Sequence, residues 1–128
     1  LKAAAALPEG GAPSVVGFST VAVQTGMGFH ASIAAAKGAV EGLVRTMSAE
    51  FAPDIRVNAI APSLTDTPLA ASLLSSDTKR EASAARHPLK RIASAQDVAG
   101  TAAFLLSPAA AAITGQVLQV DNGISAVR

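Results

Sequence analysis

The sequence predicts an α/β fold in which a parallel sheet of about three strands is flanked by helices. Three short apolar runs, SVVGFS, IRVNAI and QVLQV, are typical of buried strands. Longer stretches with helical spacing separate these runs, and strands that alternate with helices favour parallel pairing through right-handed crossovers. The chain has 128 residues and neither a repeat nor a linker, so we expect one domain spanning residues 1–128.

The first half begins with a strand and continues into a long helix. Ser14–Ser19 is a short apolar run that predicts a buried strand. Thr25–Phe29 is a glycine-rich loop, and His30–Phe51 has the spacing of a helix. The apolar positions that recur at three, four and seven residues are Ile33, Val40, Leu43, Met47 and Phe51. We expect them to share one face of this helix.

Charged and small residues occupy the rest of this helix. Lys37, Glu41 and Arg45 are expected on another face, where Glu41 and Arg45 form a favourable i,i+4 pair. Internal glycines each cost up to ~1 kcal/mol of helix propensity. The small residues are Ala31, Ala34, Ala35, Gly38, Ala39 and Gly42. They indicate that a neighbouring strand or helix approaches closely.

The middle of the chain predicts a second strand, a loop and a lid. Pro53 and Asp54 end the long helix, and Ile55–Ile60 has the composition of a buried strand. Ala61–Pro68 is a polar loop bounded by prolines. Leu69–Arg86 has a weak helical pattern with mixed charges at its centre, which suits a mobile lid better than a core element.

The last third predicts a capped helix and a final strand. Ser94 and Asp97 have the spacing of a capping box, which opens a helix over Ala95–Leu106. Pro108 ends that helix, and Gln116–Val120 predicts the third strand. The helix positions expected on one side are Val98, Ala102, Leu105 and Leu106.

Composition excludes several classes of partner and site. Ten basic and nine acidic residues give a net charge of +1, so no strong field recruits nucleic acid or an anionic membrane. The absence of cysteine excludes disulfides and thiolate metal sites, and no metal-binding motif or P-loop is present. The apolar stretch Leu1–Leu7 is far shorter than the ~20 residues of a membrane span. With no signal-peptide pattern, the default expectation is the cytoplasm.

Three motifs resemble those of the short-chain dehydrogenases. Thr20 lies thirteen residues before Ile33, and Ile33 lies four before Lys37, which is similar to the Ser…Tyr-x-x-x-Lys active site of that family. Residues Arg56–Pro62 (RVNAIAP) resemble the strand and loop that carry Pro-Gly-x-x-x-Thr. Residues Ile113–Gly123 (ITGQVLQVDNG) resemble the last strand, which usually ends in Val-Asp-Gly-Gly. The resemblance extends over nearly the whole chain.

This resemblance implies a partial doubly wound (Rossmann-like) sheet and an oxidoreductase activity. The implied reaction is hydride transfer between NAD or NADP and an alcohol or carbonyl compound. The chain resembles only the C-terminal half of such an enzyme. The T-G-x-x-x-G-x-G turn that cradles the cofactor pyrophosphate has no counterpart here. We therefore expect the chain alone to bind the cofactor in the millimolar range or more weakly, about −4 kcal/mol.

The resemblance also assigns roles to individual residues. Lys37 corresponds to the lysine that holds the nicotinamide ribose, and Thr20 to the serine that steadies the substrate oxygen. Ile33 fills the position of the tyrosine acid–base and has no proton to donate. Ser63 stands where glycine is usual in the family. Because glycine allows a positive φ that serine disfavours, the loop at Ser63 is expected to depart from the family's backbone conformation. The positions assigned to the cofactor are Lys37, Pro62, Ser63 and Thr67.

Two histidines raise further possibilities for acid–base chemistry. His30, one helical turn before the tyrosine position, can either relay a proton or simply begin the helix. His87 is expected to lie in a plain loop. A hydrolase triad of Ser19 or Ser63 with a histidine and Asp66 is not expected, because no G-x-S-x-G elbow surrounds either serine.

The expected assembly is a homo-oligomer, either a dimer or a tetramer. In the family arrangement, the outer edge of Ser14–Ser19 pairs with a further strand, and an unpaired edge is either covered or aggregates. The segments His30–Phe51 and Ala95–Val120 correspond to family subunit contacts. Two function classes stay open: a relative or piece of an oxidoreductase, and a non-catalytic module for assembly.

Overall fold

The computed structural model describes residues 13–127 and contains the predicted parallel sheet. Its three strands are β1 (Ser14–Phe18), β2 (Arg56–Pro62) and β5 (Val117–Val120), in the order β1-β2-β5. Both pairings are parallel, with Ser14 beside Arg56 and Ala59 beside Val117. The predicted α/β class and strand count are confirmed, although individual strand ends differ by one or two residues.

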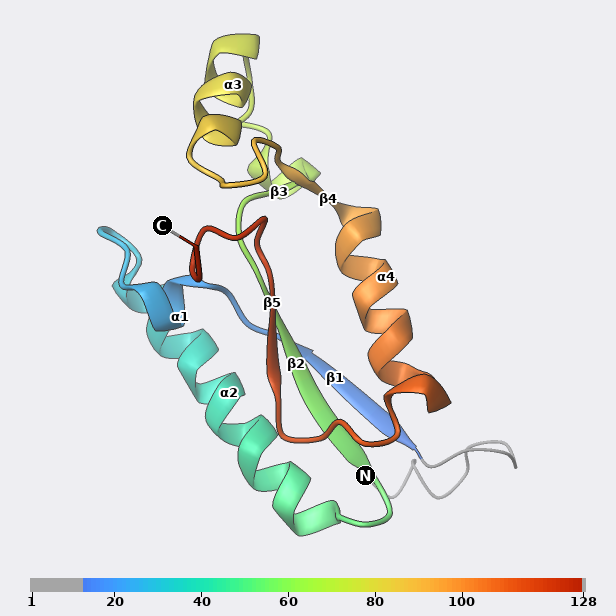
Figure 1. Cartoon of the computed structure of the whole chain (residues 1–128). Coiled ribbons are helices and arrows are strands. Elements are labelled where there is room, and N and C mark those ends of the chain that lie inside the picture. The colour runs from blue at the N-terminus through green and yellow to red at the C-terminus, as the bar shows by residue number, and fades with distance from the viewer. Residues whose placement is uncertain (1–12, 128) are drawn as a thin grey trace.

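Helices α2 (Ala31–Phe51) and α4 (Ala95–Leu106) cover opposite faces of the sheet (Figure 1). The central strand β2 supplies both cores because its side chains alternate between the two faces. Val57 and Ala59 pack in a cluster with Val44 of α2. Ile60 packs in a second cluster with Leu105 of α4. A parallel strand that is covered on both faces has a mostly apolar sequence, and this composition is why the sequence predicted β2.

The buried face of α2 matches the predicted one only in part, with Val40, Met47 and Phe51 packed against the core as expected. Its buried residues are Glu41, Val44 and Ser48. Ile33 and Leu43, which we expected on the apolar face, are 43% and 57% exposed. The face of α2 that meets the sheet is therefore centred on Val44 and includes the polar residues Glu41 and Ser48.

The glycines of α2 predicted that a neighbouring element approaches this helix closely at those positions, but the close approach lies at a glycine of β1. A Cβ at Gly42 would meet no atom within 4 Å, and one at Gly38 would only touch Val23 at 3.8 Å. A Cβ at Gly17 of β1 would lie 3.3 Å from Val40, which is tighter than ordinary contact. The tight fit between β1 and α2 therefore depends on a glycine in the strand.

The predicted single helix over Leu69–Arg86 is wrong. The structure has a 3-10 turn, η2 (Pro68–Ala70), then turns, then a short helix, α3 (Asp77–Ala85). Ser76 caps α3 by accepting a hydrogen bond from the Lys79 N–H at 3.3 Å, so the helix begins where a capping side chain is available. In Figure 1 this segment projects beyond the carboxyl ends of the strands.

Four short elements were not predicted from the sequence. Strands β3 (Thr65–Asp66) and β4 (Ala93–Ser94) pair in parallel and join the two ends of the lid segment. Helix α1 (Ala22–Thr25) follows β1, and the 3-10 turn η3 (Pro108–Ala110) follows α4. Elements of two to four residues carry no periodicity that a sequence pattern could show.

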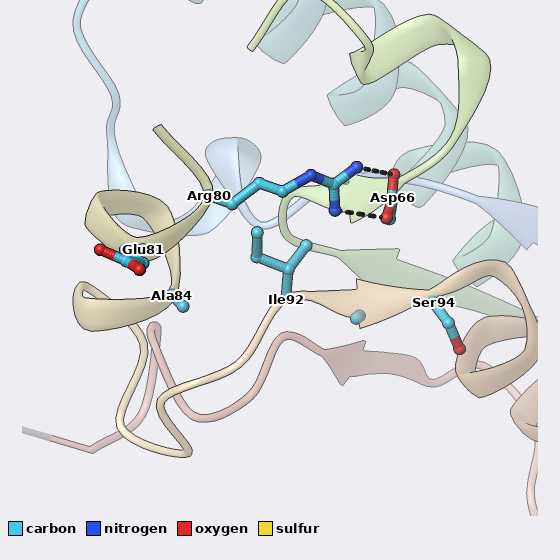
Figure 2. A pocket seen from close by; sticks show the side chains of 7 residues that line it. Asp66, Arg80, Glu81, Ala84, Ile92 and Ser94 are labelled. Carbon is cyan, nitrogen blue, oxygen red and sulfur yellow. Dashed lines mark hydrogen bonds and ion pairs between the residues drawn. The ribbon is translucent and has the colours of Figure 1, made fainter. Parts of the chain in front are cut away.

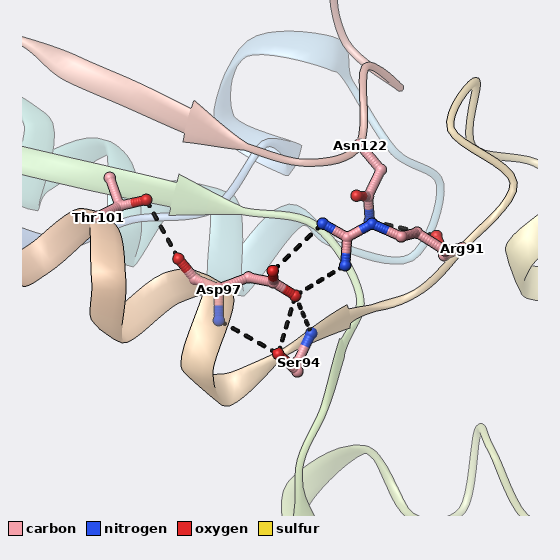
Figure 3. A network of polar contacts seen from close by, with 5 residues as sticks. All are labelled: Arg91, Ser94, Asp97, Thr101 and Asn122. Atoms are coloured by element: carbon pink, nitrogen blue, oxygen red, sulfur yellow. Dashed lines mark hydrogen bonds and ion pairs between the residues drawn. The ribbon is translucent and has the colours of Figure 1, made fainter.

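The predicted capping box of α4 is confirmed. The Ser94 side chain accepts from the Asp97 N–H at 3.2 Å, and Asp97 Oδ2 accepts from the Ser94 N–H at 2.7 Å. Figure 3 shows the Arg91 guanidinium on the same carboxylate, at 2.9 and 3.2 Å. Asn122 donates to the Arg91 carbonyl at 3.2 Å, so the network connects the start of α4 with the turn after β5.

Buried polar groups of β2 hold the other end of α4 and the approach to β5. Arg56 donates to the carbonyls of Leu105 and Ser107 at 2.8 and 3.0 Å, which satisfies groups that a helix end leaves unpaired. Asn58 donates to the Ile113 carbonyl at 2.9 Å and accepts from the Gln116 N–H at 3.0 Å. Among the helices of residues 13–127, none has the length and hydropathy for a bilayer crossing.

Candidate functional site

A pocket of about 560 Å³ opens at the carboxyl ends of the strands. Thr20 follows β1, Pro62 ends β2 and Ile124 follows β5, and all three line the pocket. Open α/β sheets bind ligands at this edge. Four of the sequence-predicted site residues line this pocket together: Thr20, Pro62, Ser63 and Thr67.

Thr20 presents its hydroxyl at the start of α1. Its Oγ1 accepts a hydrogen bond from the Ala22 N–H at 3.3 Å. A hydroxyl that accepts through a lone pair keeps its proton for another partner. Thr20 can therefore donate to an oxygen atom in the pocket, which is the role that the resemblance assigns to it.

Lys37 and Ile33 lie on α2 and are not among the residues that line this pocket. The Lys37 Nζ donates to the Phe18 carbonyl at 2.9 Å, which holds the ammonium at the carboxyl end of β1. Ile33 lies one turn earlier in the helix and presents a partly exposed aliphatic side chain. Of the residues assigned by the resemblance, Thr20 therefore has its hydroxyl in the pocket, whereas the Lys37 ammonium is held at the carboxyl end of β1.

Glu41 is buried, whereas the sequence placed it with Lys37 and Arg45 on a face apart from the apolar residues. It is 4% exposed, and its Oε1 accepts from the Ser19 hydroxyl at 2.6 Å. Arg45 lies 4.0 Å from its other carboxylate oxygen. The expected i,i+4 pair exists, but the stronger contact of Glu41 is to the residue that follows β1.

The loop after β2 is held by its own hydroxyl groups. The Thr65 hydroxyl donates to the Ser63 carbonyl at 3.1 Å, and the Thr67 hydroxyl donates to the Thr65 carbonyl at 3.4 Å. Residues with positive φ in the described chain do not include Ser63. Serine therefore replaces the usual glycine here without backbone strain.

His87 lies in the loop after α3, as predicted, but it is buried and hydrogen-bonded, which the sequence did not indicate. It is 1% exposed, its Nδ1 lies 2.8 Å from the Ser83 carbonyl, and its Nε2 lies 3.0 Å from Ser63 Oγ. His87 also lines the pocket. No pattern in the sequence pointed to this contact, because the two partners come from separate elements 24 residues apart.

His30 and Asp121 complete the polar groups near the pocket. His30 is exposed, its Nδ1 lies 2.7 Å from the Gly28 carbonyl, and it precedes α2 without capping it. Burial alone would raise the pKa of Asp121, but hydrogen bonds from Ser125 and from the Gly123 N–H outweigh burial and lower it. Asp121 is therefore an anion near His87 at neutral pH.

A second hollow of about 350 Å³ lies between the lid and β4 (Figure 2). Arg80 crosses it and bonds both oxygens of Asp66, at 2.8 and 3.3 Å. The hydrogen bond from Arg80 lowers the pKa of Asp66. Both side chains are nearly half exposed, so this ion pair adds little to stability. None of the residues assigned by the resemblance lines this hollow.

The chain resembles many known oxidoreductases. It is 40% identical over 120 residues to a tropinone reductase homolog of Arabidopsis thaliana, covering 93% of this chain and 46% of that protein. It is also 40% identical over 119 residues to the inactive 2-(S)-hydroxypropyl-CoM dehydrogenase 2 of Xanthobacter autotrophicus, covering 89% and 52%. The chain thus spans about half the length of the curated relatives it matches.

Solved structures match over the same extent. A short-chain dehydrogenase/reductase from Brucella melitensis has a TM-score of 0.81 and 37% identity, covering 87% of this chain and 44% of that one. A gluconate 5-dehydrogenase from Burkholderia cenocepacia, in complex with NADP and tartrate, has a TM-score of 0.82 and 29% identity, covering 90% and 46%.

The family comparison agrees with the fold and with the motifs. A family model described as enoyl-(acyl carrier protein) reductase matches residues 1–125. The matched region contains the Thr20, Ile33 and Lys37 positions, the parallel sheet and the pocket at its carboxyl edge. The chain therefore belongs to the short-chain dehydrogenase/reductase family.

Proposed function

We propose that this chain carries the substrate-facing half of an NAD(P)-dependent alcohol or carbonyl oxidoreductase, and that the 128-residue chain alone does not turn over. Ile33 carries the proposal. Reduction of a carbonyl needs a proton delivered to its oxygen, and the residue four before Lys37 is aliphatic. A relative of this chain from Xanthobacter autotrophicus is likewise named inactive.

The residues present fit the nicotinamide end of such a cofactor. When bound, NAD or NADP supplies or accepts the hydride. The Lys37 ammonium, held at the carboxyl end of β1, is a donor suited to ribose hydroxyls. Pro62, Ser63 and Thr67 would face the carboxamide end from the loop after β2. Thr20 would donate a hydrogen bond from its hydroxyl to the substrate oxygen and so orient it.

A second candidate function, a non-catalytic assembly module, is supported by two surfaces. Within the described residues, β1 pairs only with β2, so its other edge is without a partner strand. Leu43 and Ile33 are exposed on α2. Apolar helix faces and open parallel edges are features that subunit contacts cover. We propose a homo-oligomer, a dimer or a tetramer, in which these surfaces meet.

Titration of NADH and NADPH against the purified chain tests the first proposal. We expect dissociation constants in the millimolar range or weaker and no consumption of either cofactor with a panel of aldehydes and ketones. Lys37→Ala is the control for any rate that is seen. Saturable consumption that is abolished in Lys37→Ala would show that the chain is an active enzyme and would overturn the proposal.

A further inference from the structure

The hydrogen bonds of His87 define which of its nitrogens carries a proton. Nδ1 faces the Ser83 carbonyl at 2.8 Å, and a carbonyl oxygen can only accept. In the neutral imidazole, Nδ1 therefore holds the proton and Nε2 holds a free lone pair. Ser63 Oγ lies 3.0 Å from Nε2, so the serine hydroxyl donates to it. A hydroxyl, a basic nitrogen and a third group that orients the ring are the parts of an activated serine nucleophile.

The surroundings of the pair hold the His87 ring in one orientation. His87 is 1% exposed, which fixes its ring among few water molecules.

Ser63 is partly exposed and faces the pocket at the carboxyl end of β2. Leu64, Leu73 and Ile124 line the pocket together with His30 and the cationic Arg86, and its lining includes no Asp or Glu. Its volume of about 560 Å³ is in the range of small-molecule sites. Thr20 lines the same pocket and has a hydroxyl donor for an oxygen that becomes negative. The ligand that suits this lining is a small apolar ester.

Ser19, which is buried, lacks these features. Ser19 donates to Glu41 at 2.6 Å, but Ser19 is 4% exposed and does not line the pocket. A substrate cannot reach its oxygen without displacing the core. The two serines differ in access, so the pocket distinguishes Ser63 as the reactive one.

We propose that Ser63 and His87 form a nucleophile–base pair that takes the acyl group of small apolar esters. Ser63 Oγ attacks the ester carbonyl carbon as its proton passes to His87 Nε2. The bond to the alcohol oxygen then breaks, and the alcohol leaves with that proton. Water attacks the acyl-serine by the same route, which releases a carboxylic acid and restores the pair. The step involves no oxidation and no cofactor, so ester cleavage can be measured without NAD or NADP, although it uses the same pocket as the proposed oxidoreductase role.

Incubation of the purified chain with p-nitrophenyl acetate and p-nitrophenyl butyrate tests the proposal. We expect release of p-nitrophenolate and an acyl group on Ser63, located by peptide mass spectrometry after an acid quench. Phenylmethanesulfonyl fluoride should label the same residue and block the release. A label on His30 or on lysines, or no label at all, would overturn the proposal.

Variants separate a reactive pair from a structural hydrogen bond. Ser63→Gly restores the residue usual in the family and should fold, yet lose the label and the release. His87→Gln should slow acylation of Ser63 by about 100-fold or more, the scale of general base catalysis. Ser72→Ala removes an exposed serine of the lid outside this pocket and should keep the full rate. Circular dichroism checks each fold, and an unchanged rate in Ser63→Gly would refute the pair.

Discussion

Ile33 and Thr20 show how single side chains limit the chemistry of this site. Thr20 retains a hydroxyl proton that can be donated into the pocket. Ile33 has no polar atom, and it occupies the helix position where the family has its acid–base. A site with a positioning hydroxyl but no proton donor can orient a carbonyl without reducing it.

We predict that Ile33→Tyr alone will not create reductase activity in this chain. Restoring the acid–base does not help when the cofactor does not stay bound in position. The measurement is NADPH consumption with a carbonyl panel, comparing the variant with the unchanged chain. In a longer chain that supplies the glycine-rich turn, the same substitution should raise turnover. A rate in the 128-residue variant would show that the remaining contacts suffice for the cofactor.

Asn58 illustrates a single residue with a structural role. Its side chain is completely buried and bonds both the Ile113 carbonyl and the Gln116 N–H. We predict that Asn58→Ala lowers the free energy of unfolding by about 1–3 kcal/mol, because it leaves buried backbone groups without partners. Urea denaturation followed by circular dichroism measures this. Gln119→Ala, at an exposed position, should change it by less than about 0.5 kcal/mol, and an equal loss would contradict the explanation.

At the scale of elements, α4 is anchored at both ends by side chains from other segments. Asp97 closes the capping box and also binds Arg91. The hydrogen bond from Arg91, followed by those from Ser94, holds the pKa of Asp97 well below its ordinary value of 3.8. A negative charge near a helix N-terminus is favourable in addition. The start of α4 therefore depends on an ionised carboxylate.

This arrangement predicts a loss of stability in acid. A carboxyl group whose pKa is lowered by folding stabilises the protein fully at pH values above its pKa in the unfolded state. This stabilisation is lost as the pH falls through its pKa in the folded state. We therefore expect the contribution of Asp97 to decline as pH drops below its ordinary value of 3.8. Asp97→Asn should be less stable than the unchanged chain at pH 7, and the difference should shrink towards pH 2. A constant difference in urea midpoints would contradict this.

Helix α2 shows why an apolar pattern identifies a buried face only in part, because Val40 and Met47 pack on the core while other buried positions are polar. Its buried positions include Glu41 and Ser48, whereas Leu43 is exposed. Glu41 is buried because Ser19 binds its carboxylate, a partner 22 residues away in the chain. The sequence predicted the helix and its length, but the side that meets the sheet depends on contacts that local patterns do not contain.

At the scale of the whole molecule, the fold leaves apolar surface that a monomer does not cover. Strand β1 has one unpartnered edge within residues 13–127, and α2 presents small residues and Leu43 to solvent. Small side chains let a partner helix approach to about 8 Å, the close end of helix packing. These surfaces support the proposed homo-oligomer.

We predict a dimer or a larger even-numbered oligomer at micromolar concentration, closed by two-fold axes. Ala39 is exposed on α2, so Ala39→Trp should weaken assembly by holding the partner helix away. Ala85→Trp, on the exposed surface of the lid helix α3, is the matched control and should leave the mass unchanged. Size exclusion with light scattering measures the mass, and a monodisperse monomer of the unchanged chain would refute the prediction.

The sequence by itself determined the family, the α/β class, the three main strands, both long helices and the capping box of α4. These features depend on hydrophobic periodicity, local caps and motif spacing, which are properties of neighbouring residues. Only the tertiary structure decided that Glu41 and His87 are buried, and that Ser63 bonds His87 in the pocket with Thr20. Polar residues are buried when a partner satisfies their hydrogen bonds, and these partners come from distant segments that only folding brings together.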